Sequence, residues 1–250
     1  MGSVRGNDRS PMESWPAATG GVRISLPDIL TDIYRRLLTA YGPRHWWPAD
    51  TALEVIVGAV LTQNTNWRAV EKAIVRIKDQ GLLSIPALHQ TPVDELSHLV
   101  RPAGYFRLKA RRLKNLIDLL AGEYSGDLER MGQLPTGQLR DKLLAVNGIG
   151  PETADSILLY AFHRPVFVVD AYTLRVMSRH RLILPKAAYG ELQGLFMEHL
   201  PPDEAIFNEY HALLVQVGKR HCRRTPSCPR CPLEPLLTSR PPGTPPDPSA

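Results

Sequence analysis

The sequence contains no long apolar run and only three cysteines in 250 residues. Its hydrophobic stretches fall well short of the roughly 20 residues that a membrane-spanning helix needs. The opening stretch, MGSVRGNDRSPMESW, lacks the apolar core of a secretory signal. A hydrophobic content of 43% is typical of a globular protein that can bury a good core. We therefore expect a cytoplasmic protein of one or two domains with no membrane partner.

Strand-like patterning is almost absent as well. Only PVFVV at 165–169 resembles a strand, and because it has no partner run we expect an extended connector. Elsewhere apolar residues recur at three- and four-residue spacing, which is typical of amphipathic helices. One predicted helix spans 25–42, from the cap Ser25 to Gly42, and another begins at the cap Thr91. The sequence therefore predicts an all-α fold of about ten helices.

The ends of the chain also lack a packing pattern. Residues 1–24 are polar and irregular, and residues 238–250 are rich in proline. Such segments cannot bury enough apolar surface to offset the entropy cost of ordering them. We predict that both are disordered tails.

Acidic residues are outnumbered by basic ones, 25 to 30, and the pI is about 9.2. The excess is concentrated in two segments that contain no acid, with six basic residues in 101–114 and five in 219–231. Segments of this kind are either solvated faces or binding sites for a polyanion such as nucleic acid.

A Gly148-Ile149-Gly150 turn separates two helical patterns in LLAVNGIGPETADSILLYAF. Pro151 suits the first turn of the second helix, where its missing N–H is not needed. Free backbone N–H groups at a helix start attract anions, of which phosphate is the commonest in biology. Together with the two basic segments, this turn favours a nucleic-acid partner.

Asp170 ends the apolar run at 165–169 and opens a further helix. Its simplest role is that of an N-cap, for which aspartate is well suited. The helix dipole and backbone N–H groups would also keep this carboxylate ionised. A fixed negative charge of this kind can stabilise a developing cation beside bound DNA.

Two motifs closely resemble those of the endonuclease III-like helix–hairpin–helix DNA glycosylases, the HhH-GPD superfamily. They are VNGIGPETADSIL, which contains the hairpin, and VVDAYTLRV, which places Asp170 after it. The resemblance covers about residues 25–237. It implies two all-helical lobes with a DNA-binding cleft between them. One lobe is expected to be a discontinuous domain of residues 25–47 and 164–237, which carries the cysteines. The other is a helical barrel of residues 48–163, which carries the hairpin.

The same resemblance assigns roles in DNA binding. LTQNTNWRAVEKA matches the helix–loop whose glutamine, here Gln63, enters the duplex, and GYFRLKARRLK matches the loop that delivers a wedge residue, here Tyr105. An extruded base leaves a hole in the stack, which such side chains fill. The plain alternatives are a helix-end hydrogen bond for Gln63 and loop packing for Tyr105. The residues implied to grip backbone phosphate are Gly148, Ile149, Gly150 and Thr153.

One position departs from the strand-cutting members of this family. Those members carry a lysine two residues after the second hairpin glycine, and its amine forms a Schiff base with the sugar. Here the position holds Glu152, and a carboxylate cannot form an imine, so we expect no lyase activity by this route. The alternative role for Glu152 is a favourable charge in the first helical turn. The motif GIGPETAD, with an acid at the lysine position, resembles that of the monofunctional bacterial 3-methyladenine DNA glycosylases.

Tryptophans indicate the same branch of the family. Trp46 and Trp47 lie in WWP, and Trp67 directly follows QNTN. An alkylated purine such as 3-methyladenine is cationic, so stacking on electron-rich indoles favours it in a base pocket. The alternative is that all three are core aromatics. Lys219 aligns with a basic residue near the pocket edge in the family and could contact phosphate or base.

All three cysteines lie in CRRTPSCPRC, as Cys222, Cys228 and Cys231. In a reducing compartment, clustered thiols indicate a metal rather than a disulfide. The family's iron–sulfur loop has four cysteines separated by six, two and five residues. Here the first gap is five residues, and Leu237 occupies the fourth position. A [4Fe–4S] cluster would need water, His221 or His211 as a substitute ligand; otherwise the loop is a relic, and zinc is disfavoured.

We therefore expect a monofunctional DNA glycosylase of base excision repair that hydrolyses the N-glycosidic bond of an alkylated purine. Asp170 would stabilise the oxocarbenium-like sugar and align water, while Glu152 and the tryptophans line the base pocket. The chemistry needs no cofactor, and the partner is double-stranded DNA with a damaged base, bound by a monomer in the nucleoid. Two alternatives are removal of mismatched uracil or thymine opposite guanine, and non-catalytic binding of damaged DNA. A fixed acid argues against the latter.

Overall fold

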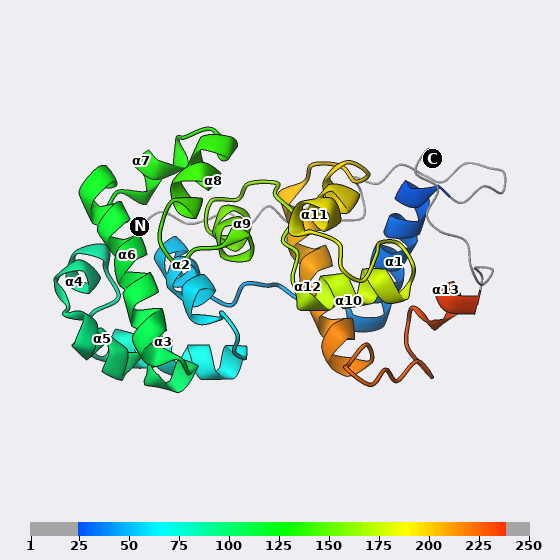
Figure 1. Ribbon diagram of the computed structural model, residues 1–250, viewed down its shortest axis with the longest axis horizontal. Coiled ribbons are helices and arrows are strands. Elements are labelled where there is room, and N and C mark those ends of the chain that lie inside the picture. Colours follow the sequence, from blue (N-terminus) through cyan, green and yellow to red (C-terminus); the bar gives the residue numbers. More distant parts are fainter. Residues whose placement is uncertain (1–24, 239–250) are drawn as a thin grey trace. The chain divides into compact units, whose positions relative to one another are not determined.

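The computed structural model describes residues 25–238, and all regular structure within them is helical (Figure 1). The predicted all-α fold is thus confirmed for these residues. They contain thirteen α-helices and one 3-10 helix. The number of α-helices is higher than the expected ten. Three of them have only five or six residues, and such short helices carry too little periodicity to be predicted. The expected tails, 1–24 and 238–250, lie outside the described residues, except that the last helix includes Thr238.

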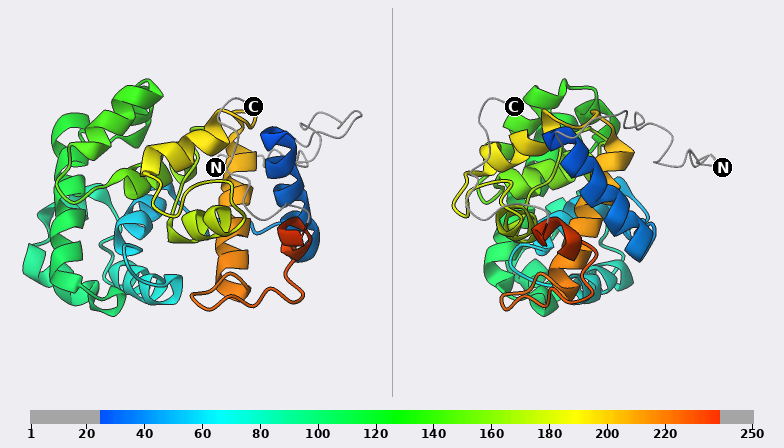
Figure 2. Two further views of the ribbon diagram at one scale, coloured as in Figure 1. Left: turned by 45° about the vertical axis from the view of Figure 1, so that its right-hand side comes forward. Right: turned by 90° about the vertical axis from the view of Figure 1, so that its right-hand side faces the viewer.

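Residues 45–168 form one compact unit. Its elements are α2 (Ala52–Leu61), α3 (Trp67–Asp79), α4 (Ile85–Gln90), α5 (Val93–Leu99), the 3-10 helix η2 (Arg101–Ala103), α6 (Phe106–Tyr124), α7 (Leu128–Gly132), α8 (Thr136–Leu144) and α9 (Pro151–Tyr160). The apolar helix α2 is buried along nearly its whole length and contacts α3, α6 and α9. The long helix α6 packs against α4 and α5 (Figures 1 and 2). This unit holds the hairpin.

A second unit is formed by residues 25–44 and 169–238. Its elements are α1 (Leu26–Tyr41), α10 (Ala171–Arg179), α11 (Tyr189–Met197), α12 (Glu204–Arg220) and α13 (Glu234–Thr238). The central helix is α12, which contacts both α1 and α10. The buried hydroxyl of Tyr210 donates a hydrogen bond to the carbonyl of Leu30 at 2.8 Å. This bond ties α12 to α1, although the two helices lie far apart in the sequence.

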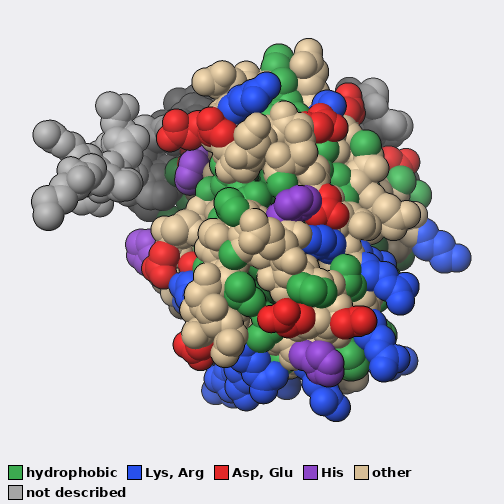
Figure 3. Space-filling model, turned by 90° about the vertical axis from the view of Figure 1, so that its left-hand side faces the viewer, with side chains coloured by type: hydrophobic (Ala, Val, Ile, Leu, Met, Phe, Trp, Pro, Cys, Tyr) green, Lys and Arg blue, Asp and Glu red, His purple; other side chains and the backbone are tan. Residues whose placement is uncertain are grey.

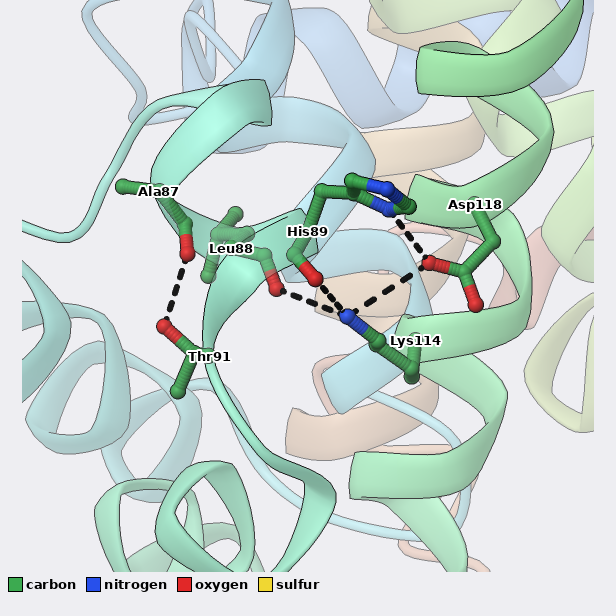
Figure 4. Close-up of polar contacts among 6 residues, drawn as sticks. All are labelled: Ala87, Leu88, His89, Thr91, Lys114 and Asp118. Atoms are coloured by element: carbon green, nitrogen blue, oxygen red, sulfur yellow. Dashed lines mark hydrogen bonds and ion pairs between the residues drawn. The ribbon is translucent and has the colours of Figure 1, made fainter.

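Capping residues set several helix ends. The predicted cap Ser25 begins α1 in a capping box with Asp28, and Gly42, with φ +66°, ends it. The prediction that Thr91 caps the next helix was wrong. Its hydroxyl donates to the carbonyl of Ala87 at 2.7 Å and closes α4 instead (Figure 4). Because Pro92 is itself the N-cap of α5, Thr91 lies one residue too early to cap that helix.

Lys114 joins α6 to the end of α4. Its ammonium group donates to the carbonyl oxygens of Leu88, at 3.5 Å, and His89, and lies 3.5 Å from Asp118 (Figure 4). The carboxylate of Asp118 is in turn 2.7 Å from Nδ1 of His89. Carbonyls at the end of a helix lack intrahelical partners, and this lysine supplies one. This member of the basic segment 101–114 therefore has a structural role.

The strand-like run PVFVV is an extended connector, as predicted. Its residues 166–169 are buried, which explains their apolar character without a sheet. None of the helices in the described part of the chain has the length and apolar character to cross a membrane.

Candidate functional site

The hairpin between α8 and α9 presents backbone donors at a helix start. Gly148 has φ +95°, and Gly150 is the N-cap of α9 with Pro151 at the first position, as predicted. Ile149 is buried, and its N–H donates to the carbonyl of Val146 at 3.0 Å. The N–H groups of Gly148 and Gly150 have no acceptor among residues 25–238. These donors and the helix dipole suit this end of α9 to a phosphate group.

Gln63 and Arg112 hold the hairpin in place. Nε2 of Gln63 donates to the carbonyl of Gly148 at 3.1 Å and to the hydroxyl of Thr153 at 3.0 Å. Arg112 of α6 donates to Oε1 of Gln63 and covers Gly148, where a Cβ atom would lie 2.3 Å from Cγ of the arginine. Position 148 therefore requires glycine for its positive φ and for lack of space. Insertion of Gln63 into DNA stays a prediction.

Two carboxylates of α9 lie in different environments. Asp155 is fully buried and accepts hydrogen bonds from Arg140 of α8 at 2.7 and 3.1 Å. This bidentate pair fixes α8 against α9 and so supports the turn between them. Glu152 is exposed at the second position of α9, where the helix dipole favours a negative charge.

Tyr105 lies in a tight turn immediately before α6. Gly104 has φ +68° and Tyr105 has φ +46°, and Tyr105 is 70% exposed. The buried Lys109 donates from Nζ to the carbonyl of Ala103 at 2.6 Å and so fixes the start of this turn. Burial and, to a smaller extent, the charge of Arg112 lower the pKa of Lys109 to about 8. An exposed ring on a fixed turn suits insertion into a base stack, and the wedge role remains a prediction.

Trp46, Trp47 and Trp67 form one aromatic cluster, which Tyr160 of α9 joins. The ring centroids lie 5.1 Å apart for the first two tryptophans, 5.3 and 5.2 Å from each to Trp67, and 5.2 Å from Trp47 to Tyr160. Aromatic rings prefer such tilted and edge-to-face contacts. Gly58 of α2 provides the space, since a Cβ atom there would lie 3.1 Å from the ring of Trp47. The three tryptophans are half-buried, so part of their surface stays accessible.

Asp170 is the N-cap of α10. Its Oδ1 accepts hydrogen bonds from the N–H of Thr173 at 2.8 Å and from the hydroxyl of the same residue at 2.9 Å. Its Oδ2 lies 3.7 Å from Nε2 of His211 on α12. Burial alone would raise the pKa of Asp170, but His211 and the Thr173 hydrogen bonds outweigh burial and lower it. The result is a fixed, ionised carboxylate whose side chain is still 13% exposed.

Lys219 and Arg175 place positive charge near the start of α10. Nζ of Lys219 lies 6.0 Å from the ring centroid of Tyr172, and the guanidinium of Arg175 lies 5.0 Å from the same ring. Gly218 allows this close packing, because a Cβ atom there would lie 2.4 Å from the ring. Since Tyr172 follows Asp170 by two residues, these cations belong to the same region of the unit as the carboxylate.

The three cysteines and Leu237 line one small pocket. Cys222 is buried, Cys228 and Cys231 are partly exposed, and none of them forms a disulfide. Arg179 donates to Sγ of Cys222 at 3.2 Å and to the next two backbone carbonyls, which fixes the loop. Within the described residues, no three His, Cys, Asp or Glu side chains are grouped to hold a metal ion. The residues present do not match a four-cysteine cluster, because Leu237 offers no ligand.

The two histidines considered as substitute ligands lie in different places. His221 lines the cysteine pocket. His211 does not line this pocket, because it contacts Asp170 instead. From His211 to Arg220, the last residue of α12 before the cysteine loop, the helix rises about 14 Å. His211 is therefore a neighbour of the carboxylate and not of the thiols. No motif spacing in the sequence connects it with Asp170.

The chain matches a known protein family and shares its fold with solved structures. The family described as HhH-GPD superfamily base excision DNA repair protein matches residues 57–202. A proposed DNA repair glycosylase of Methanocaldococcus jannaschii is 46% identical over 215 residues, which cover 85% of this chain and 97% of that protein.

Two solved structures illustrate the shared fold. The 3-methyladenine DNA glycosylase of H. pylori, bound to 1,N6-ethenoadenine, aligns with a TM-score of 0.66 and 26% identity, covering 78% of this chain and 98% of that one. A trapped covalent intermediate of endonuclease III with DNA aligns with a TM-score of 0.73 and 24% identity, covering 84% and 94%. At the latter identity the likeness shows the fold alone.

Proposed function

This chain belongs to the HhH-GPD superfamily of base excision DNA repair proteins, and we propose that it is a monofunctional DNA glycosylase for alkylated purines. It hydrolyses the N-glycosidic bond and leaves an intact abasic site in double-stranded DNA. It acts as a monomer and needs no cofactor for the chemistry. The observation that carries this proposal is the fixed, ionised carboxylate of Asp170 at the start of α10.

Asp170 supplies negative charge where the reaction develops positive charge. As the bond to the base breaks, the deoxyribose becomes oxocarbenium-like. Because Thr173 and His211 already hold the carboxylate, it needs no reorganisation when the cation forms. Oδ1 accepts two hydrogen bonds from Thr173, so we assign Oδ2 to the sugar or to the attacking water. A purine that is cationic in the nucleotide takes the bonding electron pair and leaves as a neutral base. Water then adds to the sugar cation and gives its proton to solvent, so no covalent enzyme intermediate forms.

The hairpin binds the DNA backbone in this proposal. The N–H groups of Gly148 and Gly150 donate to a phosphate, and Gln63, Arg112 and Thr153 keep the turn in shape. Contacts of this kind fix the register of the duplex and carry no base specificity. Base specificity must therefore come from the residues that receive the extruded base.

Glu152 supports a monofunctional reaction. A Schiff base requires an amine that attacks the sugar carbon, and a carboxylate at the start of α9 cannot supply one. Hydrolysis by water is then the remaining route for release of the base. The charge of Glu152 is favourable at this position for the helix itself, and in the base pocket it would also attract a cationic purine.

The tryptophan cluster supports a cationic substrate. Indole faces attract cations by about 1–2 kcal/mol in a desolvated site. Trp46, Trp47 and Trp67 gather this ring surface in one place and leave part of it accessible. A structural relative that shares 26% identity is named a 3-methyladenine DNA glycosylase, which is consistent with this substrate class.

Base release from duplexes that each carry one lesion tests the proposal. The set contains 3-methyladenine, 1,N6-ethenoadenine, uracil opposite guanine and thymine opposite guanine. We expect release of 3-methyladenine, the cationic alkylated purine of the set, with an intact abasic site as product. Release from the two mismatches alone would identify a mismatch glycosylase, and tight binding without release of any base would identify a non-catalytic binder of damaged DNA.

A further inference from the structure

A groove lined by basic side chains runs along α3. Arg68, Lys72 and Arg76 follow one another at four-residue spacing, so they share one face of this helix. Arg101 of η2 contributes a fourth cation to the same hollow of about 520 Å³. Figure 3 shows Lys and Arg side chains gathered along the lower edge of the face it draws, at the level of α3 in Figure 1. The other lining residues are Asn66, Ala69 and Pro102.

Neighbouring acids do not neutralise these four cations. All four residues are exposed, and within residues 25–238 none of them forms an ion pair. Lys78, further along α3, is by contrast paired with Asp50 at 3.0 Å and Glu54 at 2.9 Å. Grouped like charges repel one another and destabilise the fold slightly. A bound polyanion would relieve that repulsion.

The groove adjoins the two loops with predicted roles at the lesion. Helix α3 begins directly after the loop 63–66 that carries Gln63. The element η2 directly precedes the turn that carries Tyr105, and it contacts α3. Both loops and the groove therefore belong to the same compact unit. The basic groove begins next to the two loops that are predicted to contact the lesion.

We propose that this groove binds the sugar–phosphate backbone of a DNA strand beside the lesion. The inference rests on the proposed function as a DNA glycosylase. From Arg68 to Arg76, α3 rises about 12 Å, which equals the rise of three or four nucleotides at about 3.4 Å each. Among the described residues that line the groove there is no aromatic side chain on which a base could stack. Binding in the groove is therefore independent of DNA sequence.

The salt dependence of DNA binding tests this groove. The variant Arg68→Ala/Lys72→Ala/Arg76→Ala is compared with the wild-type chain on an undamaged duplex and on one that carries an abasic-site analogue. Each lost phosphate contact reduces the slope of log K against log salt by about 0.9, so the slope should fall by up to about 2.7. Between 50 and 200 mM salt, the wild-type chain should then lose about 40-fold more affinity than the variant.

A control with the same change in net charge separates the groove from overall electrostatics. Arg35→Ala/Arg130→Ala/Lys186→Ala removes three exposed cations from α1, α7 and the segment before α11. We expect this variant to keep most of the wild-type slope. Arg68→Lys/Arg76→Lys, which keeps the charges, should keep it too. If the groove variant and the control have the same slope, the groove does not bind DNA.

Duplex length gives a second, independent measurement. When the duplex is shortened on one side of the abasic-site analogue, the difference between the wild-type chain and the groove variant should disappear. Shortening on the other side should leave the difference intact, because the groove engages only one flank. Equal effects on both sides would overturn the proposal. Both measurements record binding alone, so they remain valid even if the wild-type chain releases no damaged base.

Discussion

Oδ2 of Asp170 lies 3.7 Å from Nε2 of His211, and the two residues come from different helices of one unit. The N-cap geometry of α10 alone would hold only Oδ1 of this carboxylate, through Thr173. His211 of α12 adds an electrostatic contact to the other oxygen, Oδ2. Hydrogen bonds therefore fix one oxygen while the imidazole lies beside the other, and together these contacts lower the pKa of Asp170 in spite of burial. This arrangement suits a group that must stay ionised next to a developing cation.

Replacement of Asp170 by Asn should remove base release and leave DNA binding intact. The amide keeps the shape of the cap but lacks the charge, so we expect a loss of about 10²–10³-fold or more in the single-turnover rate. The matched control is Asp203→Asn, which alters another N-cap aspartate in the same unit, that of α12. The control should stay active. Undiminished release by the Asp170→Asn chain would exclude the proposed mechanism.

Replacement of His211 by Gln should change the pH dependence of base release. Without His211, burial is opposed only by the Thr173 hydrogen bonds, so the pKa of Asp170 rises. The acid limb of the rate profile should then move to higher pH, while DNA affinity stays close to that of the wild-type chain. His221→Gln, at the far end of α12, is the control and should leave the profile in place. An unshifted profile for His211→Gln would limit its role to packing.

The hairpin and most helices could be predicted because their signals are local. Apolar spacing, the cap Ser25 and the two glycines of the turn each act within a few residues, and the structure places them as expected. The cap assigned to Thr91 was wrong for an equally local reason. The following proline takes the N-cap position, so the hydroxyl turns back to the preceding helix.

The contacts that complete the candidate site could not be predicted. His211 reaches Asp170, Arg112 covers Gly148, and Tyr160 joins the tryptophans only after distant helices have packed. No periodicity or motif spacing connects such pairs. The basic segment 101–114 contains both Arg112, which contacts Gln63, and Lys114, which anchors α4. Nothing in the sequence of this segment distinguishes the roles of these two residues.

The product of the reaction should be an intact abasic site, without a strand break until alkali or an endonuclease is added. The resemblance to strand-cutting members of the family implies that Glu152 stands where they carry an imine-forming lysine, so we expect borohydride to trap no covalent complex with DNA. Glu152→Lys is the informative comparison, because it restores an amine at the start of α9. If borohydride traps a covalent complex of the wild-type chain with DNA, another amine, such as that of Lys219, performs lyase chemistry.

Replacement of Trp67 by Ala should slow the release of 3-methyladenine more than the release of a neutral base such as uracil or hypoxanthine. Loss of one indole face removes about 1–2 kcal/mol of attraction for a cation, which corresponds to roughly tenfold in rate. The substitution also removes packing against Trp46 and Trp47, and that damage should affect every substrate equally. The ratio of the two single-turnover rates therefore isolates the cationic preference. Trp67→Phe, which keeps a ring with a weaker attraction for cations, should lie between the wild-type chain and Trp67→Ala. Equal losses on charged and neutral bases would make the cluster purely structural, and specificity for alkylated purines would then depend on their already weakened glycosidic bond.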